Sequence, residues 1–195
     1  TSEQKETCTG CTTCGPKIAL TPMERLIALS TGLFAFMHFS ASLAPSVTGE
    51  DSGELITAAY FLGIVHPPGY PLWCMLAHPF TWLPWGDVAW RVNLSSAFFG
   101  ACTVSVMCMI GMHLFKSRWA AVCAALCLAF SFEFFEQSVV AEVYTLNALL
   151  LSICWLVLMR WRLKGHCDQC LYFFAVVYGL SLGNHNTMLV LGPVF

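Results

Sequence analysis

The sequence predicts an all-α polytopic membrane protein with about five transmembrane helices and an amphipathic or re-entrant outer loop between the first two. Hydrophobic residues make up 57% of the 195 residues and charged residues only 10%, whereas an ordinary soluble domain carries about 25% charged residues. The charges lie in clusters, and five long runs contain none: 26–49, 92–115, 119–132, 143–159 and 169–195. Such a chain suits lipid rather than water.

Four of these runs are long enough for a membrane-spanning helix, which needs about 20 residues. The first run follows Arg25 and lacks a small-residue cleavage site, so we expect a retained signal anchor rather than a cleaved signal. The third run is short. It reaches spanning length when it continues through Gln137, with Glu133 and Glu136 at the level of the lipid headgroups.

The segment 55–86 also lacks Asp, Glu, Lys and Arg, but it is rich in proline. Because proline removes a backbone donor and blocks a continuous helix, a crossing there would leave unpaired polar groups in lipid. We therefore interpret residues 46–91 as an outer loop that lies on the membrane. Three of its tryptophans, Trp73, Trp82 and Trp85, suit the membrane interface.

The distribution of charges predicts the orientation. With five crossings and a cytosolic N-terminus, eight of the nine basic residues lie on the cytosolic side and only Arg91 lies outside. Most acidic residues lie on the outer side. No basic patch indicates a nucleic-acid partner.

Residues 1–25 read as a cytosolic tail and residues 26–195 as the N-terminal part of one transmembrane domain, truncated at Phe195. Five cysteines are expected on the cytosolic side: Cys8, Cys11, Cys14, Cys167 and Cys170. Their spacing is compatible with a metal site, with S-acylation or with inert thiols, and the sequence leaves these alternatives open.

The densest acidic cluster is Glu50, Asp51 and Glu54, at the outer end of the first predicted crossing. Neighbouring negative charge and partial desolvation raise a carboxyl pKa, which suits a general base. The same two residue types also have a purely structural explanation. Asp51 followed three residues later by Glu54 matches a helix-capping box.

Other polar residues of the predicted outer side are candidates for a binding site. His66 is followed by two prolines in His66-Pro67-Pro68-Gly69-Tyr70, which fixes its direction, and Arg91 can pair with a phosphate. Glu142 begins the fourth crossing. Asn184 and His185 are expected well inside the fifth crossing, where unpaired polar groups are costly.

Two motifs carry a resemblance to a known family: Gly49-Glu50-Asp51-Ser52-Gly53-Glu54-Leu55-Ile56-Thr57-Ala58-Ala59 and His66-Pro67-Pro68-Gly69-Tyr70-Pro71-Leu72. Shorter matches follow at Arg91-Val92-Asn93-Leu94, at Ala141 to Asn147 and at Gly179 to Asn184. The chain resembles the eukaryotic transmembrane O-mannosyltransferases that modify plexin-type immunoglobulin-like (IPT) domains, and their bacterial relatives, within the glycosyltransferase C superfamily.

The resemblance implies an inverting enzyme of the endoplasmic reticulum membrane. It would move mannose from dolichyl phosphate mannose, a polyprenyl-phosphate sugar, to Ser or Thr hydroxyls of lumenal protein domains. Asp51 would be the general base, with Glu54 orienting it or the acceptor. The other site residues would bind donor or acceptor: Glu50, His66, Tyr70, Arg91, Glu142, Asn184 and His185. No metal or other cofactor is expected.

Two rival functions come from other classes. In a transporter or channel, Asp51, Glu54, Glu142 and His185 would form a path for protons or cations. A non-catalytic membrane scaffold, or an inactive fragment, would carry out neither transfer nor transport.

Overall fold

The computed structural model describes residues 19–49, 51–115, 117–163 and 168–194, and within these ranges it is helical, without strands. The elements follow in the order α1 (Pro22–Ala41), α2 (Ser52–Phe61), α3 (Pro71–Ala77), η1 (His78–Trp82), α4 (Val88–Leu114), α5 (Arg118–Ala129), α6 (Phe132–Val139), α7 (Tyr144–Leu163), α8 (Asp168–Ser181), α9 (Thr187–Leu191) and η2 (Gly192–Val194). The all-α prediction is confirmed.

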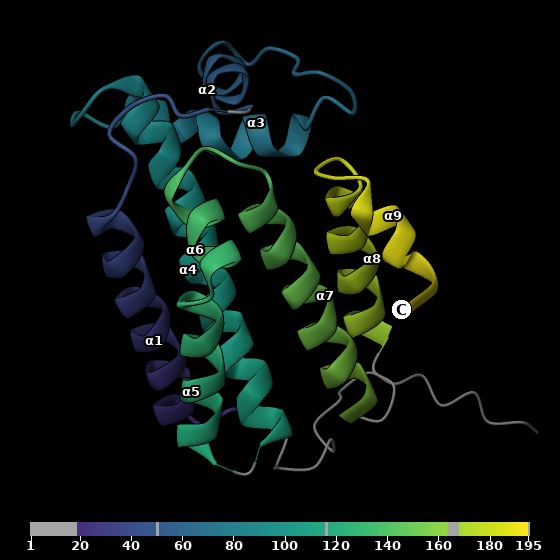
Figure 1. Cartoon of the computed structure of the whole chain (residues 1–195). Helices are drawn as coiled ribbons and strands as arrows, with labels where there is room; N and C mark the ends of the chain where they lie inside the picture. Colours follow the sequence, from purple (N-terminus) through teal and green to yellow (C-terminus); the bar gives the residue numbers. More distant parts are fainter. Residues whose placement is uncertain (1–18, 50, 116, 164–167, 195) are drawn as a thin grey trace, which may run out of the picture.

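The long helices form a bundle, and α2 and α3 lie across one end of it (Figure 1). Helix α4 is central, because it packs against α1, α5 and α7, while α8 packs against α7. Arg25 lies in the first turn of α1, Arg118 begins α5, and Arg160 and Arg162 lie in the last turn of α7. These helix ends lie at the end of the bundle opposite α2 and α3 (Figure 1). These four arginines therefore lie away from the outer loop, as predicted. The orientation of the bundle in a membrane stays a prediction.

Two helices, α4 and α7, are long and apolar enough to cross a membrane, and α5 with α6 makes a third if the bent pair counts as one span. Helix α8, with 14 residues, is shorter than a full span. Membrane crossing by a helical bundle is thus supported, and the number five stays a prediction.

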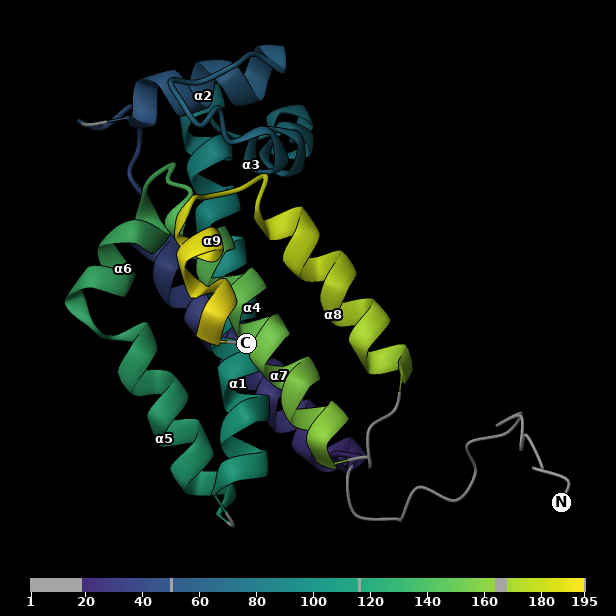
Figure 2. The same cartoon turned by 90° about the vertical axis from the view of Figure 1, so that its right-hand side faces the viewer.

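The third predicted span is not straight. Helices α5 and α6 meet at 64°, and the bend between them is visible in Figure 2. The Ser131 hydroxyl donates to the Leu128 carbonyl at 2.7 Å, and a hydroxyl bound to the backbone in this way competes with helix continuation. Ser131 then stands at the N-cap of α6.

The prediction of one helix through 169–195 is wrong. Helix α8 ends at Ser181, the chain turns, and α9 runs back in the opposite direction (Figure 1). Asn184 and His185 consequently lie in a turn rather than inside a span. This turn lies beside α2 and α3, which together form the outer layer. Gly183 fixes this turn to the outer layer, because its carbonyl accepts a hydrogen bond from the Leu72 amide at 3.2 Å.

The outer layer has both buried and exposed apolar side chains. Its inner face joins the core around Trp73, which is fully buried rather than at the interface as predicted. Other large apolar side chains of this layer and its loops are exposed: Phe61, Ile64, Trp82 and Trp85. A segment that lies on a membrane needs such a surface, although contact with the membrane stays a prediction.

Helices α1 and α4 approach each other closely at Gly32. A Cβ atom there would lie 2.8 Å from the Ser105 Cβ and 2.9 Å from the Ala101 carbonyl oxygen. Ser105 also donates to the Ala28 carbonyl at 3.0 Å. Small residues allow such close helix packing in membranes.

We expect Gly32→Val to lower the midpoint of thermal unfolding in detergent by several degrees, because overpacking costs about 1–3 kcal/mol. Gly179→Val in α8 is the matched control, since a Cβ atom there meets nothing within 4 Å. Equal midpoints for the two variants would show that the α1–α4 contact is not tight.

Candidate active site

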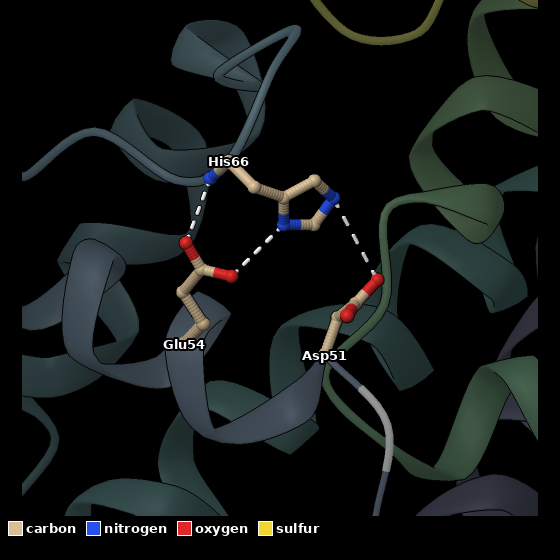
Figure 3. A group of neighbouring side chains, drawn as sticks. All are labelled: Asp51, Glu54 and His66. Carbon is tan, nitrogen blue, oxygen red and sulfur yellow. Dashed lines mark hydrogen bonds and ion pairs between the residues drawn. The ribbon is translucent and has the colours of Figure 1, made fainter.

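The first residues of α2 do not form the capping box that the sequence allowed. Asp51 stands at the N-cap position, but its side chain makes no hydrogen bond to the first turn of the helix. Glu54 turns away from the N-cap toward His66. The structural explanation for this pair of acids is therefore wrong, and both carboxylates face the loop that carries His66 (Figure 3).

Glu54 holds His66 through both of its oxygen atoms. Oε1 accepts from the His66 backbone amide at 2.7 Å, and Oε2 lies 2.8 Å from the ring atom Nδ1. The carboxylate accepts at both positions, so Nδ1 carries a proton, and Nε2 faces Tyr70 and Asp51. Glu54 is thereby a positioning group for the imidazole.

Asp51 lies on the other side of the ring. Its Oδ2 atom is 3.7 Å from His66 Nε2, beyond a hydrogen bond but within ion-pair range (Figure 3). The Asp51 side chain is 58% exposed. The two acids thus differ: one is occupied by His66, and the other presents its carboxylate to the solvent.

The contact between Glu54 and His66 shifts the pKa values of both residues. The hydrogen bond to Glu54 raises the pKa of His66 against the opposing effect of desolvation, and the charges of Asp51, Glu54 and Glu142 raise it further. The hydrogen bonds from His66 lower the pKa of Glu54. His66 consequently keeps a positive charge to higher pH than an isolated histidine does.

Tyr70 connects His66 to the turn after α8. Its hydroxyl lies 3.4 Å from His66 Nε2, and its ring stacks on His185 with centroids 5.9 Å apart and planes 5° from parallel. Tyr70 takes a left-handed conformation, φ 43°, immediately after Gly69 at φ 92°. This tight turn directs Tyr70 between the two histidines.

His185 is fixed by its own turn. The Thr187 backbone amide donates to Nδ1 at 3.2 Å, so Nδ1 is an acceptor and the neutral ring carries its proton on Nε2. Desolvation lowers the pKa of His185, which favours this neutral form. The Tyr144 ring packs on the same imidazole at 5.4 Å between centroids.

Glu142 and Asn184 lie behind these rings. The Glu142 backbone carbonyl accepts from Trp73 Nε1 at 3.0 Å and from the Ser96 hydroxyl at 3.3 Å. The Asn184 amide donates to the Val143 carbonyl at 3.3 Å, and its Oδ1 is buried without a partner. Both residues border the site, where their buried groups fix the start of α7 against the outer layer.

Arg91 lies elsewhere. Its guanidinium donates to the carbonyls of Thr81, Trp85 and Gly86 at 2.8 to 3.2 Å. These contacts give Arg91 a structural role in closing the loop before α4, and its predicted role with a phosphate stays untested.

Some predictions fall on other parts of the chain. Glu50, Cys8, Cys11, Cys14 and Cys167 lie outside the described residues, while Cys170 is partly buried in α8.

Asp51, Glu54 and His66 also have the composition of a metal site. Their potential ligand atoms lie within 4.8 Å of one another. A metal at this position would have to compete with the hydrogen bond between His66 Nδ1 and Glu54. The prediction that no metal is needed remains to be tested.

Comparison with known proteins adds the family. A family model described as the N-terminal domain of protein O-mannosyl-transferase TMEM260 matches residues 51–195, so the match begins at Asp51 and includes the described site. This chain belongs to that family. The predicted resemblance to transmembrane O-mannosyltransferases is confirmed, and the choice of plexin-type acceptors stays a proposal.

Two curated relatives carry the same family name. The chain is 37% identical to protein O-mannosyl-transferase TMEM260 of Mus musculus over 156 residues, 78% of this chain and 22% of the relative. It is 29% identical to its Dictyostelium discoideum namesake over 119 residues, 59% of this chain and 14% of the relative. The chain thus spans about a fifth of the mouse relative's length. No solved structure matches the chain.

Sequence reasoning did not assign a role to Tyr144, and it placed Trp73 at the membrane surface. Tyr144 belongs to the site because its ring packs on His185, and Trp73 because its indole N–H donates to the Glu142 carbonyl. The only signal for Tyr144 was its position two residues after Glu142, at the start of an apolar run.

Proposed function

We propose that this chain forms the catalytic end of a membrane protein O-mannosyltransferase. The enzyme moves mannose from dolichyl phosphate mannose to Ser or Thr hydroxyls of lumenal domains, with plexin-type domains as the first acceptors to test. It lies in the endoplasmic reticulum membrane with its N-terminus in the cytosol. The names of its relatives support the reaction class.

The difference between the two carboxylates is the observation that carries the proposal. Glu54 is held by His66, whereas Asp51 presents an exposed carboxylate 3.7 Å from the same ring. A general base needs a free acceptor oxygen that a substrate proton can reach. Asp51 meets this requirement and Glu54 does not.

The proposed step is a single displacement. Asp51 accepts the proton of the acceptor hydroxyl, whose oxygen forms a bond to the anomeric carbon of mannose. The bond from that carbon to the phosphate oxygen breaks, and dolichyl phosphate leaves with the electron pair. Attack from the face opposite the leaving group inverts the anomeric centre.

The leaving phosphate needs positive charge nearby. Arg91 is engaged by loop carbonyls, so His66 is the better candidate among the described residues of this end. Its raised pKa keeps it cationic to higher pH. Its Nε2 atom, which faces Tyr70 and Asp51, can donate to a phosphate oxygen.

The transporter alternative receives less support from the bundle. The groove that follows α4 and α7 is lined by Thr103, Ser152 and nine apolar side chains, without a titratable group. A path for protons or cations needs polar groups through the membrane.

The test is transfer of radiolabelled mannose from dolichyl phosphate mannose to a plexin-type domain, catalysed by the intact protein in membranes. We expect transfer, and we expect it to persist in a metal chelator, because Glu54 and His66 bind each other. Loss of transfer in the chelator, with recovery after Mn²⁺ or Mg²⁺ is added, would show a metal at the site. Ion flux without transfer would favour the transporter.

A further inference from the structure

The turn between α8 and α9 (Figure 1) is tied to α3 and to the segment before α7. At its start, the Gly183 carbonyl accepts a hydrogen bond from the Leu72 amide at 3.2 Å. The side-chain amide of the next residue, Asn184, donates to the Val143 carbonyl at 3.3 Å. These two bonds fix the backbone immediately before His185.

Thr187 completes the attachment of this turn, because its hydroxyl has a partner on two sides. The side-chain amide of Asn147, in α7, donates to Thr187 Oγ1 at 2.9 Å. The same oxygen lies 3.0 Å from His185 Nδ1, and the Thr187 backbone amide donates to that nitrogen at 3.2 Å. A ring nitrogen that accepts from a backbone amide carries no proton, so the Thr187 hydroxyl donates to it as well. Asn147, Thr187 and His185 thus form a chain of hydrogen bonds that runs in one direction.

This chain of bonds fixes the chemical form of the imidazole. Two donors at Nδ1 favour the neutral ring with its proton on Nε2, because protonation of Nδ1 would remove the acceptor of the Thr187 amide. Desolvation also lowers the pKa of His185. Nε2 itself bonds to no described residue, and solvent can reach it. His185 therefore presents one accessible N–H donor whose position and charge are set by its neighbours.

A structural role at the start of α9 accounts only for the Nδ1 side of the His185 ring. It leaves the Nε2 donor without a function, and it does not require the two tyrosines that pack on the imidazole. Tyr70 stacks on the ring with planes 5° from parallel, and Tyr144 packs on it at 53°. These contacts restrict rotation of the imidazole, so the Nε2 proton has a fixed direction. Such preorganisation is typical of a group that binds a substrate.

The two histidines of the site differ in charge, which separates their roles. The pKa of His66 is raised, so it suits the anionic phosphate of the donor, whereas no described charge acts on the pKa of His185. The strongest bonds to phosphate come from charged donors, so a neutral N–H donor is better suited to an uncharged oxygen such as a sugar hydroxyl. Tyr70 lies between the imidazoles, with its centroid 5.4 Å from that of His66 and 5.9 Å from that of His185. In the donor, one sugar ring likewise separates the phosphate from the far hydroxyls.

We propose that His185 donates a hydrogen bond from Nε2 to a hydroxyl of the transferred sugar. Thr187 and Asn147 are positioning residues, which hold the imidazole neutral and correctly oriented for this bond. The identity of the sugar rests on the proposed function. Loss of the bond weakens recognition of one hydroxyl only, whereas loss of a structural contact weakens the use of every donor equally.

The test compares dolichyl phosphate mannose with a set of analogues that each lack one sugar hydroxyl. The intact protein in membranes is assayed for transfer to a plexin-type domain, and kcat/KM is measured for each donor. For one analogue, we expect the wild type to show a value about tenfold lower than for mannose, as the loss of one neutral hydrogen bond predicts. His185→Phe keeps a flat ring beside both tyrosines. It should lower the value for mannose about tenfold and the value for that analogue no further.

The positioning role is tested with the same set of donors. Thr187→Val keeps the shape of the side chain but removes its hydroxyl, so discrimination against that analogue should weaken, and Thr187→Ser should restore it. Asn147→Leu should act in the same direction as Thr187→Val, because it removes the donor that orients the hydroxyl. Thr57→Val is the matched control. Thr57 is an exposed threonine of α2 whose hydroxyl donates to the Gly53 carbonyl of the same helix, so this variant should keep the wild-type rate and discrimination.

Binding is measured separately, as the rise in the midpoint of thermal unfolding that each donor causes in detergent. Binding that discriminates against one analogue in the wild type but not in His185→Phe, without mannose transfer, supports the sugar contact and rejects the transferase reaction. Normal transfer by the wild type, with equal losses for every donor in His185→Phe, overturns the sugar contact and leaves the reaction intact. Unchanged discrimination in Thr187→Val overturns the positioning role. Neither binding nor transfer with any of these donors rejects both proposals.

Discussion

Asp51→Asn is expected to lower the rate of mannose transfer at least about a hundredfold, because a positioned general base contributes about 10²–10⁴. The substitution keeps the size of the side chain and removes its ability to accept a proton. It should leave the amount of folded protein unchanged, since Asp51 makes no capping bond to α2. The measurement is transfer to a plexin-type domain at saturating donor, normalised to protein in the membrane.

Asp87→Asn is the matched control for this prediction. Asp87 is also an acidic N-cap at the outer end, and its Oδ1 accepts from the Trp90 amide at 2.7 Å. Asn is an equally good N-cap, so this variant should retain both stability and transfer. Similar rates for the Asp51 and Asp87 variants would remove Asp51 from the role of base.

Glu54→Gln is expected to lower transfer about tenfold or more and to change its pH dependence, because Glu54 both orients His66 and keeps it protonated. The contact raises the pKa of His66. If His66 must be cationic to stabilise the phosphate, activity is lost as pH rises through this raised value. Without the carboxylate, the pKa of His66 falls, and the loss should occur at lower pH.

The measurement is the alkaline side of the pH–rate profile, for wild type and Glu54→Gln. Glu136→Gln is a suitable control, because Glu136 is an exposed acid on α6 that makes no ion pair among the described residues. An unchanged alkaline limb in the Glu54 variant, together with lower activity, would assign Glu54 a packing role and remove His66 as the cation.

The sequence predicted local geometry well where residues lie close together along the chain. Asp51 and Glu54 are one helical turn apart, and the His66-Pro67-Pro68-Gly69-Tyr70 motif marks a fixed turn. The cap of α4 is equally local, because Asp87 accepts from the Trp90 amide three residues later. These features depend on local backbone geometry, which short sequence patterns specify.

The sequence failed where distant contacts decide between local alternatives. A capping box and a carboxylate bound to His66 are both compatible with the same Asp and Glu, and the structure contains the second. The long apolar run after residue 169 allowed one helix, but contacts of Gly183 with Leu72 and of Asn184 with Val143 accompany a turn. Trp73 was likewise expected at the membrane interface, but its indole N–H donates to the Glu142 carbonyl in the core.

The sequence by itself determined that this chain is a helical membrane protein, which end of it is acidic, and which family it resembles. Composition and charge are the sums of properties of single residues, so they can be read from the sequence without knowledge of the fold. The tertiary structure decided which acid is bound to His66, which acid faces the solvent, and how the Tyr144 ring meets His185. These properties arise from contacts between residues 12 to 69 positions apart, as in the pairs of Glu54 with His66 and Trp73 with Glu142, and a linear pattern does not contain them.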